Sequence, residues 1–236
     1  AASGSRSGGV LVDARKLGDG GIGVYIENLI DGILETTELG DAVPNLGIFV
    51  GERFLQRGVC PNLDAVHERW SDRVEFVFDP SPKYSLRELF AFSQRQRSVL
   101  ARYGLFHSPH YTLPYFLPMP SVVTIHDCIH ISHPQSLLHR IFGVRLIRSA
   151  LRRADRVLTV SEHSRQQIER YAGKARQSIA VIPNSIRLGL ERPKAEETKR
   201  VLRDSRVLQP YFLVVGSDRP HKGFAALCQG LRSYLD

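Results

Sequence analysis

The sequence has few cysteines and no long apolar run, and each absence narrows the possible classes of protein. Its 236 residues include 3 cysteines, Cys60, Cys128 and Cys228, which lie far apart and lack metal-site spacing. An odd number of widely spaced cysteines fits reduced thiols, so we expect a cytoplasmic protein. No apolar stretch approaches the ~20 residues of a membrane span, and no signal peptide is visible.

Several catalytic patterns are also missing. No serine, histidine and aspartate stand out as a nucleophile with its base. No Walker loop occurs, because that loop needs Gly-Lys-Ser/Thr after four spacers. His126, His130 and His133 are not at tight ligand spacing, so we predict no metal.

The overall composition fits a globular protein that binds something anionic. Hydrophobic residues make up 42% and charged residues 24%, which suits one large domain or two smaller ones. The formal net charge of +8 indicates an anionic partner. A nucleotide, a phosphorylated substrate, nucleic acid and an anionic membrane surface all remain open.

The clearest local pattern is a strand–helix–strand unit within Ala154–Ile186. Arg156–Val160 and Ser178–Ile182 are short apolar runs with β-branched residues, which are typical of buried strands. Between them, Ser161 or Ser164 is a candidate N-cap for a helix over Ser164–Ala172, with Gly173 as the residue that ends it. Two parallel strands joined by a helix need both sheet faces covered, so the unit predicts an α/β fold.

Further strands and helices alternate before this unit. The predicted strands are Val10–Asp13, Leu46–Val50, Val74–Phe78, Leu105–His107 and Ser121–Ile125. The predicted helices are Val24–Leu34, Leu86–Ala101 and Leu137–Ala154. The alternation favours a parallel sheet, whose ligands bind beyond the carboxyl ends of the strands.

The helix predicted over Leu137–Ala154 has two different faces. At ~100° per residue, one side carries Phe142, Leu146, Ala150 and Ala154. The other side carries Arg145, Arg148, Arg152 and Arg156. This basic face is either an ordinary solvated surface or a peripheral contact with anionic lipid at the inner membrane face.

The sequence pattern also predicts domain boundaries. We expect a flexible tail at residues 1–9, a first domain at 10–186, a linker at 187–209 and the start of a second domain at 210–236. The last part predicts a strand over Tyr211–Val215 and a helix over Phe224–Tyr234. One strand and one helix cannot bury their own apolar faces, so we expect the second domain to be truncated here. Apolar surface left by the missing part is expected to drive artificial association.

Three polar segments lie next to predicted strands. Gly18-x-Gly20-x-x-Gly23 matches a dinucleotide-binding pattern, but the match is weak because Ala14–Leu17 separate it from the strand. Its backbone N–H groups at a helix start still suit a phosphate. His126 and Asp127 end a buried strand, where ligand sites form.

The third polar segment, Gly216–Gly223, lies between a predicted strand and a predicted helix. It offers Arg219, His221 and Lys222 beside backbone amides at a helix start. This composition suits a phosphate group, although a polar surface turn has the same composition.

Taken together, three segments resemble the signature blocks of glycosyltransferase family 4. The segments are Ser121–Pro134 (SVVTIHDCIHISHP), Arg153–Ile186 and Pro210–Leu227 (PYFLVVGSDRPHKGFAAL). The resemblance implies a retaining enzyme of the GT-B fold, with two Rossmann-like domains and no metal cofactor. The chain would then hold the acceptor-side domain and the first strand and helix of the nucleotide-sugar domain.

The resemblance also implies roles for individual residues. Gly20 and Gly21 would face the donor diphosphate and the transferred sugar, and Ser161 would lie on the donor side. His126 and Asp127 would lie at the reaction centre. Three further donor-binding residues are expected in the last segment, namely Ser217, Arg219 and Lys222. Tyr111 and His110 are expected to contact the acceptor, a saccharide or a lipid-linked molecule.

This chain departs from the family pattern in three places. Gly216-Ser217 stands where Gly-Arg is common, so one cation for the diphosphate would come from Arg219. Pro183-Asn184-Ser185 replaces Pro-Asn-Gly. The paired-glutamate motif has no residues here, so we expect this fragment to be inactive alone.

The sugar is expected to be a hexose, with mannose favoured, carried by a nucleotide diphosphate. Two other functions remain open. The first is an NAD-dependent enzyme that uses Gly18, Gly20 and Gly23. The second is a basic module that binds nucleic acid, which the lack of interleaved aromatic residues argues against.

Overall fold

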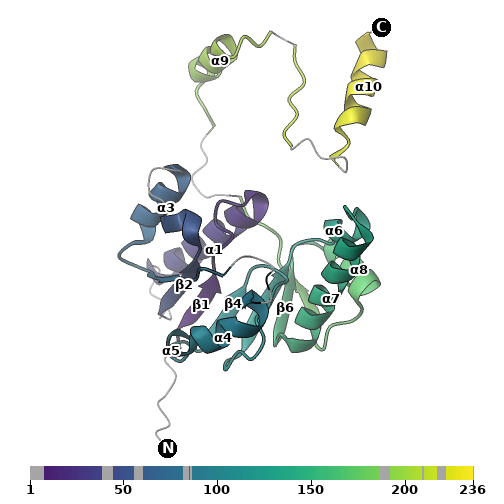
Figure 1. Ribbon diagram of the computed structural model, residues 1–236. Coiled ribbons are helices and arrows are strands. Elements are labelled where there is room, and N and C mark those ends of the chain that lie inside the picture. The colour runs from purple at the N-terminus through teal and green to yellow at the C-terminus, as the bar shows by residue number, and fades with distance from the viewer. Residues whose placement is uncertain are drawn as a thin grey trace, which may run out of the picture. The chain divides into compact units, whose positions relative to one another are not determined.

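The computed structural model describes residues 8–38, 45–55, 61–81, 85, 87–186, 192–208, 210–216 and 222–235. The chain divides into two compact units, Ala1–Ile186 and Arg187–Asp236. The first unit contains a sheet flanked by helices (Figure 1).

The sheet has seven strands in the order β3-β2-β1-β4-β5-β6-β7. The strands are β1 (Val10–Asp13), β2 (Leu46–Val50), β3 (Glu75–Phe78), β4 (Leu105–Ser108), β5 (Ser121–Ile125), β6 (Arg156–Thr159) and β7 (Ile179–Val181). Every neighbouring pair is parallel. The chain therefore starts in the middle, builds one half of the sheet, and then crosses β1 to build the other half.

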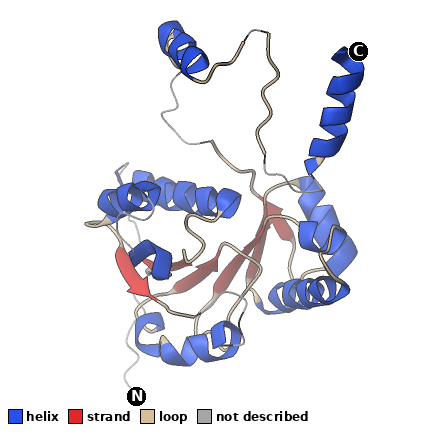
Figure 2. Cartoon of the chain, turned by 45° about the horizontal axis from the view of Figure 1, so that its top comes forward, coloured by secondary structure: helices blue, strands red, loops and turns tan. Residues whose placement is uncertain are grey.

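Helices cover both faces of this sheet (Figure 2). The helices are α1 (Gly20–Glu38), α2 (Glu52–Leu55), α3 (Pro61–Trp70), α4 (Phe92–Arg95), α5 (Arg97–Leu100), α6 (Ile129–Ser132), α7 (Leu137–Arg153) and α8 (Glu162–Ala172). A π-helical turn, η1 (Arg87–Ala91), precedes α4. The fold is thus the predicted Rossmann-like α/β sandwich.

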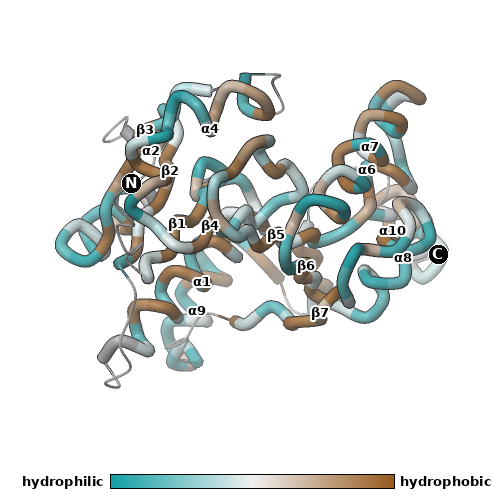
Figure 3. The backbone as a smooth tube through the Cα atoms, turned by 90° about the horizontal axis from the view of Figure 1, so that it is seen from below, coloured by the Kyte–Doolittle hydropathy of each residue, from teal (hydrophilic) through white to brown (hydrophobic). Residues whose placement is uncertain are grey.

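Two apolar clusters hold the layers together. On one face of the sheet, Ile26 and Ile30 of α1 and Trp70 of α3 pack with Val12 and Ile48. On the other face the cluster joins strands to α4, α5, α7 and α8, and it includes Phe49, Phe92, Phe106, Val123, Ile147 and Ile168. Apolar residues colour much of the central strands brown (Figure 3). Parallel strands need this two-sided burial.

The strand–helix–strand prediction is confirmed in detail. Strand β6, helix α8 and strand β7 follow one another, and β7 pairs with β6 in parallel. Ser161 caps α8, because its hydroxyl accepts from the Ser164 N–H at 3.1 Å. Gly173 ends the helix at φ 90°, a conformation that favours glycine.

The helix predicted over Leu86–Ala101 is broken into three short pieces, η1, α4 and α5. Two of its polar side chains bond to Asp79, directly after β3. Arg95 Nη2 donates to Asp79 Oδ2 at 2.7 Å, and Gln96 Nε2 donates to the same oxygen at 3.0 Å. Tertiary bonds of this kind override helical propensity. Arg156, predicted to extend the basic face of α7, instead begins β6.

The second unit contains α9 (Ala195–Asp204) and α10 (Phe224–Leu235). The prediction of a strand over Tyr211–Val215 is wrong, because these residues form no strand in the structure. A strand needs a neighbour for its N–H and C=O groups. Within the described part of the second unit, no other segment forms a strand that could supply one. Among the helices in the described ranges, none has the length and apolar character to cross a bilayer.

Replacing Gly143 by alanine tests the packing of α7. A Cβ at Gly143 would lie 2.4 Å from Cδ2 of His130, whereas a Cβ at Gly32 of α1 would meet nothing within 4 Å. We expect Gly143→Ala to destabilise the fold by about 1–3 kcal/mol and Gly32→Ala to stabilise it by about 0.5–1 kcal/mol. Urea unfolding gives the change in the free energy of unfolding for both variants. Equal effects of the two substitutions would contradict the close contact at His130.

Candidate functional site

Parallel pairing brings the ends of β1, β4 and β5 to one edge of the sheet. His126 and Asp127 directly follow β5, and His110 and Tyr111 follow β4 after one intervening residue. The first turn of α1 follows β1 after a short loop. The sequence argument predicted ligand binding at this edge.

One pocket at this edge contains four of the predicted site residues. We call it the histidine pocket, and it is lined by Ile22, His110, Tyr111, Thr124, His126 and Asp127. Ile22 belongs to the first turn of α1, directly after Gly20 and Gly21. The structure therefore brings the predicted acceptor residues and the predicted reaction centre together.

His126 is half-buried and held in one orientation. Its Nε2 lies 3.1 Å from the Pro109 carbonyl oxygen, which can only accept, so Nε2 carries the proton. The Tyr25 ring meets the His126 ring edge-on, with the centroids 4.7 Å apart. Burial lowers the pKa of His126, against the opposing effects of the Pro109 bond and of Asp127. A neutral ring bonded in this way keeps Nδ1 as a hydrogen-bond acceptor.

The Thr124 hydroxyl connects Tyr25, which contacts the His126 ring, to His107. Thr124 Oγ1 is 3.1 Å from the Tyr25 hydroxyl and 2.9 Å from Nε2 of His107. Burial, and to a smaller extent the neighbouring His126, lowers the pKa of His107 to about 4. His107 is therefore neutral at physiological pH and acts as a buried structural partner of Thr124.

The tilted rings of His110 and Tyr111 form one wall of the histidine pocket. His110 Nδ1 accepts from the Thr112 N–H at 3.3 Å, so its proton sits on Nε2. The rings of His110 and Tyr111 lie 3.9 Å apart, and Tyr111 stacks on His130 at 4.7 Å. Asp127 Oδ1 accepts from the Ile129 N–H at 3.0 Å, which fixes the start of α6.

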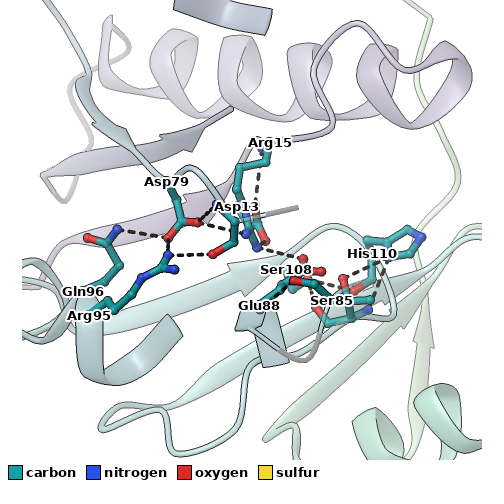
Figure 4. Close-up of polar contacts among 11 residues, drawn as sticks. Asp13, Arg15, Asp79, Ser85, Glu88, Arg95, Gln96, Ser108 and His110 are labelled. Atoms are coloured by element: carbon teal, nitrogen blue, oxygen red, sulfur yellow. Dashed lines mark hydrogen bonds and ion pairs between the residues drawn. The ribbon is translucent and has the colours of Figure 1, made fainter. Parts of the chain in front are cut away.

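A second pocket adjoins the first through His110. We call it the acidic pocket, and it is lined by Asp13, Arg15, Lys16, Ile26, Glu88, Pro109, His110 and Thr112. Figure 4 shows the polar contacts beside it. Arg15 is the central group, and its guanidinium is buried among three carboxylates.

The ion pairs of Arg15 connect three segments of the chain. Its Nη2 lies 2.6 Å from Asp13 Oδ2 and 3.0 Å from Glu88 Oε1, and its Nη1 lies 3.6 Å from Asp79 Oδ1. Burial alone would lower the pKa of Arg15, but the carboxylates of Asp13, Glu88 and Asp79 raise it. Arg15 is therefore a permanent cation that fixes the ends of β1 and β3 and the η1 turn.

The glycine loop before α1 combines tight packing with an open helix start. A Cβ at Gly23 would lie 2.8 Å from the Gly18 nitrogen, so only glycine lets α1 pack on its own loop. Gly20 and Gly21 are exposed, and a Cβ at either would meet nothing within 4 Å. The first N–H groups of a helix lack partners within it and favour an anion.

The other predicted donor residues are placed differently. Ser161 uses its hydroxyl to cap α8, and Ser164 of the same turn donates to the His126 carbonyl at 2.8 Å. Lys222 lies just before α10 in the second unit and is exposed. Ser217 and Arg219 lie outside the described residues. The donor role of all four remains a prediction.

The described part of the chain contains no cluster of side chains suited to a metal ion. No three His, Cys, Asp or Glu side chains there are close enough to hold an ion. Cys128 is buried, and burial raises the pKa of its thiol to about 12, with Asp127 adding to the effect. Such a thiol is protonated at neutral pH.

Comparison with protein families matches residues 20–190 to Glycosyltransferase Family 4, which is well over half of the 236-residue chain. The chain belongs to this family. One curated relative is the O-antigen chain mannosyltransferase RfbU of Salmonella typhimurium, 26% identical over 141 residues. That match covers 58% of this chain but 36% of the relative, so the chain spans about a third of the relative's length.

Sequence reasoning missed the acidic pocket. Asp13 ends β1 at the same sheet edge as His126, so the rule that identified His126 also applies to Asp13 and Arg15. Glu88 carries no such signal, because it lies in a segment with a regular helical pattern and a basic surface. Its burial depends on Arg15, 73 residues away.

The acid sensitivity of the fold tests the ion-pair cluster. Burial alone would raise the pKa of Asp79, but Ser81, Gln96 and Arg15 lower it below 3.8. The ionised group therefore stabilises the fold above about pH 4, and this stability is lost as the pH falls through the lowered pKa. We expect Asp79→Asn to cost about 3 kcal/mol at pH 7 and to flatten the loss of stability in acid.

Urea unfolding between pH 7 and pH 2 measures this effect. Glu68→Gln, which removes an exposed carboxylate from α3, is the matched control and is expected to leave the profile unchanged. An Asp79→Asn profile parallel to that of the unsubstituted protein would contradict the role of the cluster.

Proposed function

We propose that this family 4 protein transfers a hexose from a nucleotide-diphosphate sugar to a saccharide or lipid-linked acceptor, with retention of configuration. The supporting observation is the histidine pocket. It combines His126, Asp127, His110 and Tyr111 with the first turn of α1 at one sheet edge. Mannose is the favoured hexose, and the name of the Salmonella relative supports that choice.

The donor diphosphate is proposed to lie at the start of α1. The N–H groups of Gly20 and Gly21 lie at the positive end of a 19-residue helix. Because glycine has no side chain, a phosphate can approach these N–H groups closely. Negative charge grows on the diphosphate as the glycosidic bond breaks. Hydrogen-bond donors that are already oriented toward the diphosphate stabilise this charge without a metal. Lys222, with Arg219 or Ser217, is also proposed to bind the donor diphosphate.

His126 is proposed to bind the transferred sugar. Its neutral ring keeps Nδ1 as an acceptor for a sugar hydroxyl, while Pro109 and Tyr25 hold the ring still. Asp127 would place negative charge near the oxocarbenium-like state. The acceptor is proposed to use His110 and Tyr111.

A transfer assay on the entire gene product tests this proposal. GDP-mannose and UDP-glucose are supplied with saccharide and lipid-linked acceptors, and NMR of the product gives its anomeric configuration. We expect transfer from GDP-mannose with the donor's configuration kept. An inverted product would overturn retention. NAD binding without any sugar transfer would favour the dinucleotide alternative and overturn the proposal.

Two substitutions separate the proposed roles. Loss of one hydrogen bond to the sugar in His126→Ala is expected to lower kcat/KM by about tenfold or more. Gly21→Ala adds a methyl group at the helix start without a clash, so it is expected to weaken donor binding by about tenfold with the fold intact. Gly32→Ala, further along α1, is the matched control. Unchanged kinetics in both site variants would contradict the assignment.

A further inference from the structure

Helix α7 combines a one-signed charge with exposed apolar residues. Its 17 residues contain no aspartate or glutamate. They contain five arginines, Arg140, Arg145, Arg148, Arg152 and Arg153. On the neighbouring α8, Glu162 and Glu169 both pair with Arg165. The acidic groups of α8 are therefore already engaged.

The start of α7 exposes large apolar side chains. Leu137 is 70% exposed and Leu138 is 78% exposed, while Ile141 and Phe142 are each 42% exposed. The same helix meets its packing needs with other residues, since Leu146, Ile147, Ala150 and Leu151 are buried on its inner side. Adjacent exposed apolar residues of this size mark an interaction surface more often than isolated ones do.

These two features lie on one stripe of the helix. At ~100° per residue, six exposed residues fall within an arc of about 100°. They are Leu137, Leu138, Ile141, Arg145, Arg148 and Arg152, which we call the α7 stripe. Its apolar half is the N-terminal half, and its basic half follows over about 10 Å of helix. Arg148 is held at the surface, because its Nε donates to the Ala172 carbonyl at 3.2 Å.

We infer that the α7 stripe docks on a bilayer surface rich in anionic phospholipid. The leucines and Ile141 enter the boundary between headgroups and acyl chains, and the arginines lie at the level of the lipid phosphates. Both halves are needed, because stable peripheral binding combines apolar insertion with attraction to anionic lipid. The stripe has no residue in either pocket, so the inference does not depend on the transfer reaction.

Other occupants fit the stripe less well. A second copy placed stripe to stripe would set arginines against arginines, with no carboxylate of α7 between them. A nucleic acid would attract the arginines, but it offers no apolar interior for Leu137 and Leu138. A bilayer satisfies both parts of the surface.

Vesicle flotation tests the inference on this chain. The probes are vesicles of phosphatidylcholine alone and vesicles with about one-third phosphatidylglycerol. We expect binding to the anionic vesicles only, weakened by salt. The double variant Arg145→Glu/Arg152→Glu is expected to lose at least about 25-fold in affinity, about fivefold for each charge neutralised. Leu137→Ser/Leu138→Ser is expected to lose about tenfold or more.

Control variants each carry one substitution of a similar kind elsewhere on the surface. Arg97→Glu on α5 and Val24→Ser on α1 alter exposed residues away from the stripe and are expected to bind as the unsubstituted protein does. Circular dichroism confirms that each variant is folded. No binding to anionic vesicles, or an equal loss in Arg97→Glu, would overturn the inference. Preferred binding of RNA, or self-association that only the leucine variant abolishes, would also overturn it.

Discussion

The site depends on one constraint, the parallel pairing of every strand in the sheet. Strands β1, β4 and β5 lie side by side and run the same way, so the residues that follow them meet at one edge. This arrangement places the first turn of α1 beside His110 and His126, although about a hundred residues separate them in sequence. An antiparallel neighbour at β4 would carry His110 to the opposite edge and divide the pocket.

Buried polar groups then fix the geometry at this edge. Arg15 ties β1 to the end of β3 and to the η1 turn, while Thr124 links Tyr25 of α1 with His107 of β4. Breaking a buried network of this kind costs free energy, because it leaves polar groups unpaired in a low-dielectric interior. The intact networks therefore favour one arrangement of the loops over others. His126 gains its fixed tautomer from the same setting, through the carbonyl of Pro109. A rigid edge of this kind suits catalysis that relies on groups oriented in advance.

Periodicity predicted most of the fold, because apolar runs and caps act locally. The strands, the long helix α7 and the Ser161 cap all follow from short stretches of sequence. Interactions that join distant residues could not be predicted. The broken helix at Arg87–Leu100 results from bonds to Asp79, and the missing strand at Tyr211–Val215 results from the lack of a pairing neighbour. Within the site, His126 and Asp127 could be predicted because they lie at the end of a strand. The role of Glu88 could be recognised only from its ion pair with Arg15 in the tertiary structure.

The central claim is that the histidine pocket is where donor sugar and acceptor meet. The most direct measurement is a crystal structure of the entire gene product with a nucleoside-diphosphate sugar and an acceptor bound. We predict that the transferred sugar lies within hydrogen-bonding distance of His126 and that the diphosphate lies against the N–H groups of Gly20 and Gly21. A sugar bound away from this edge, with His126 contacting no ligand, would contradict this proposal.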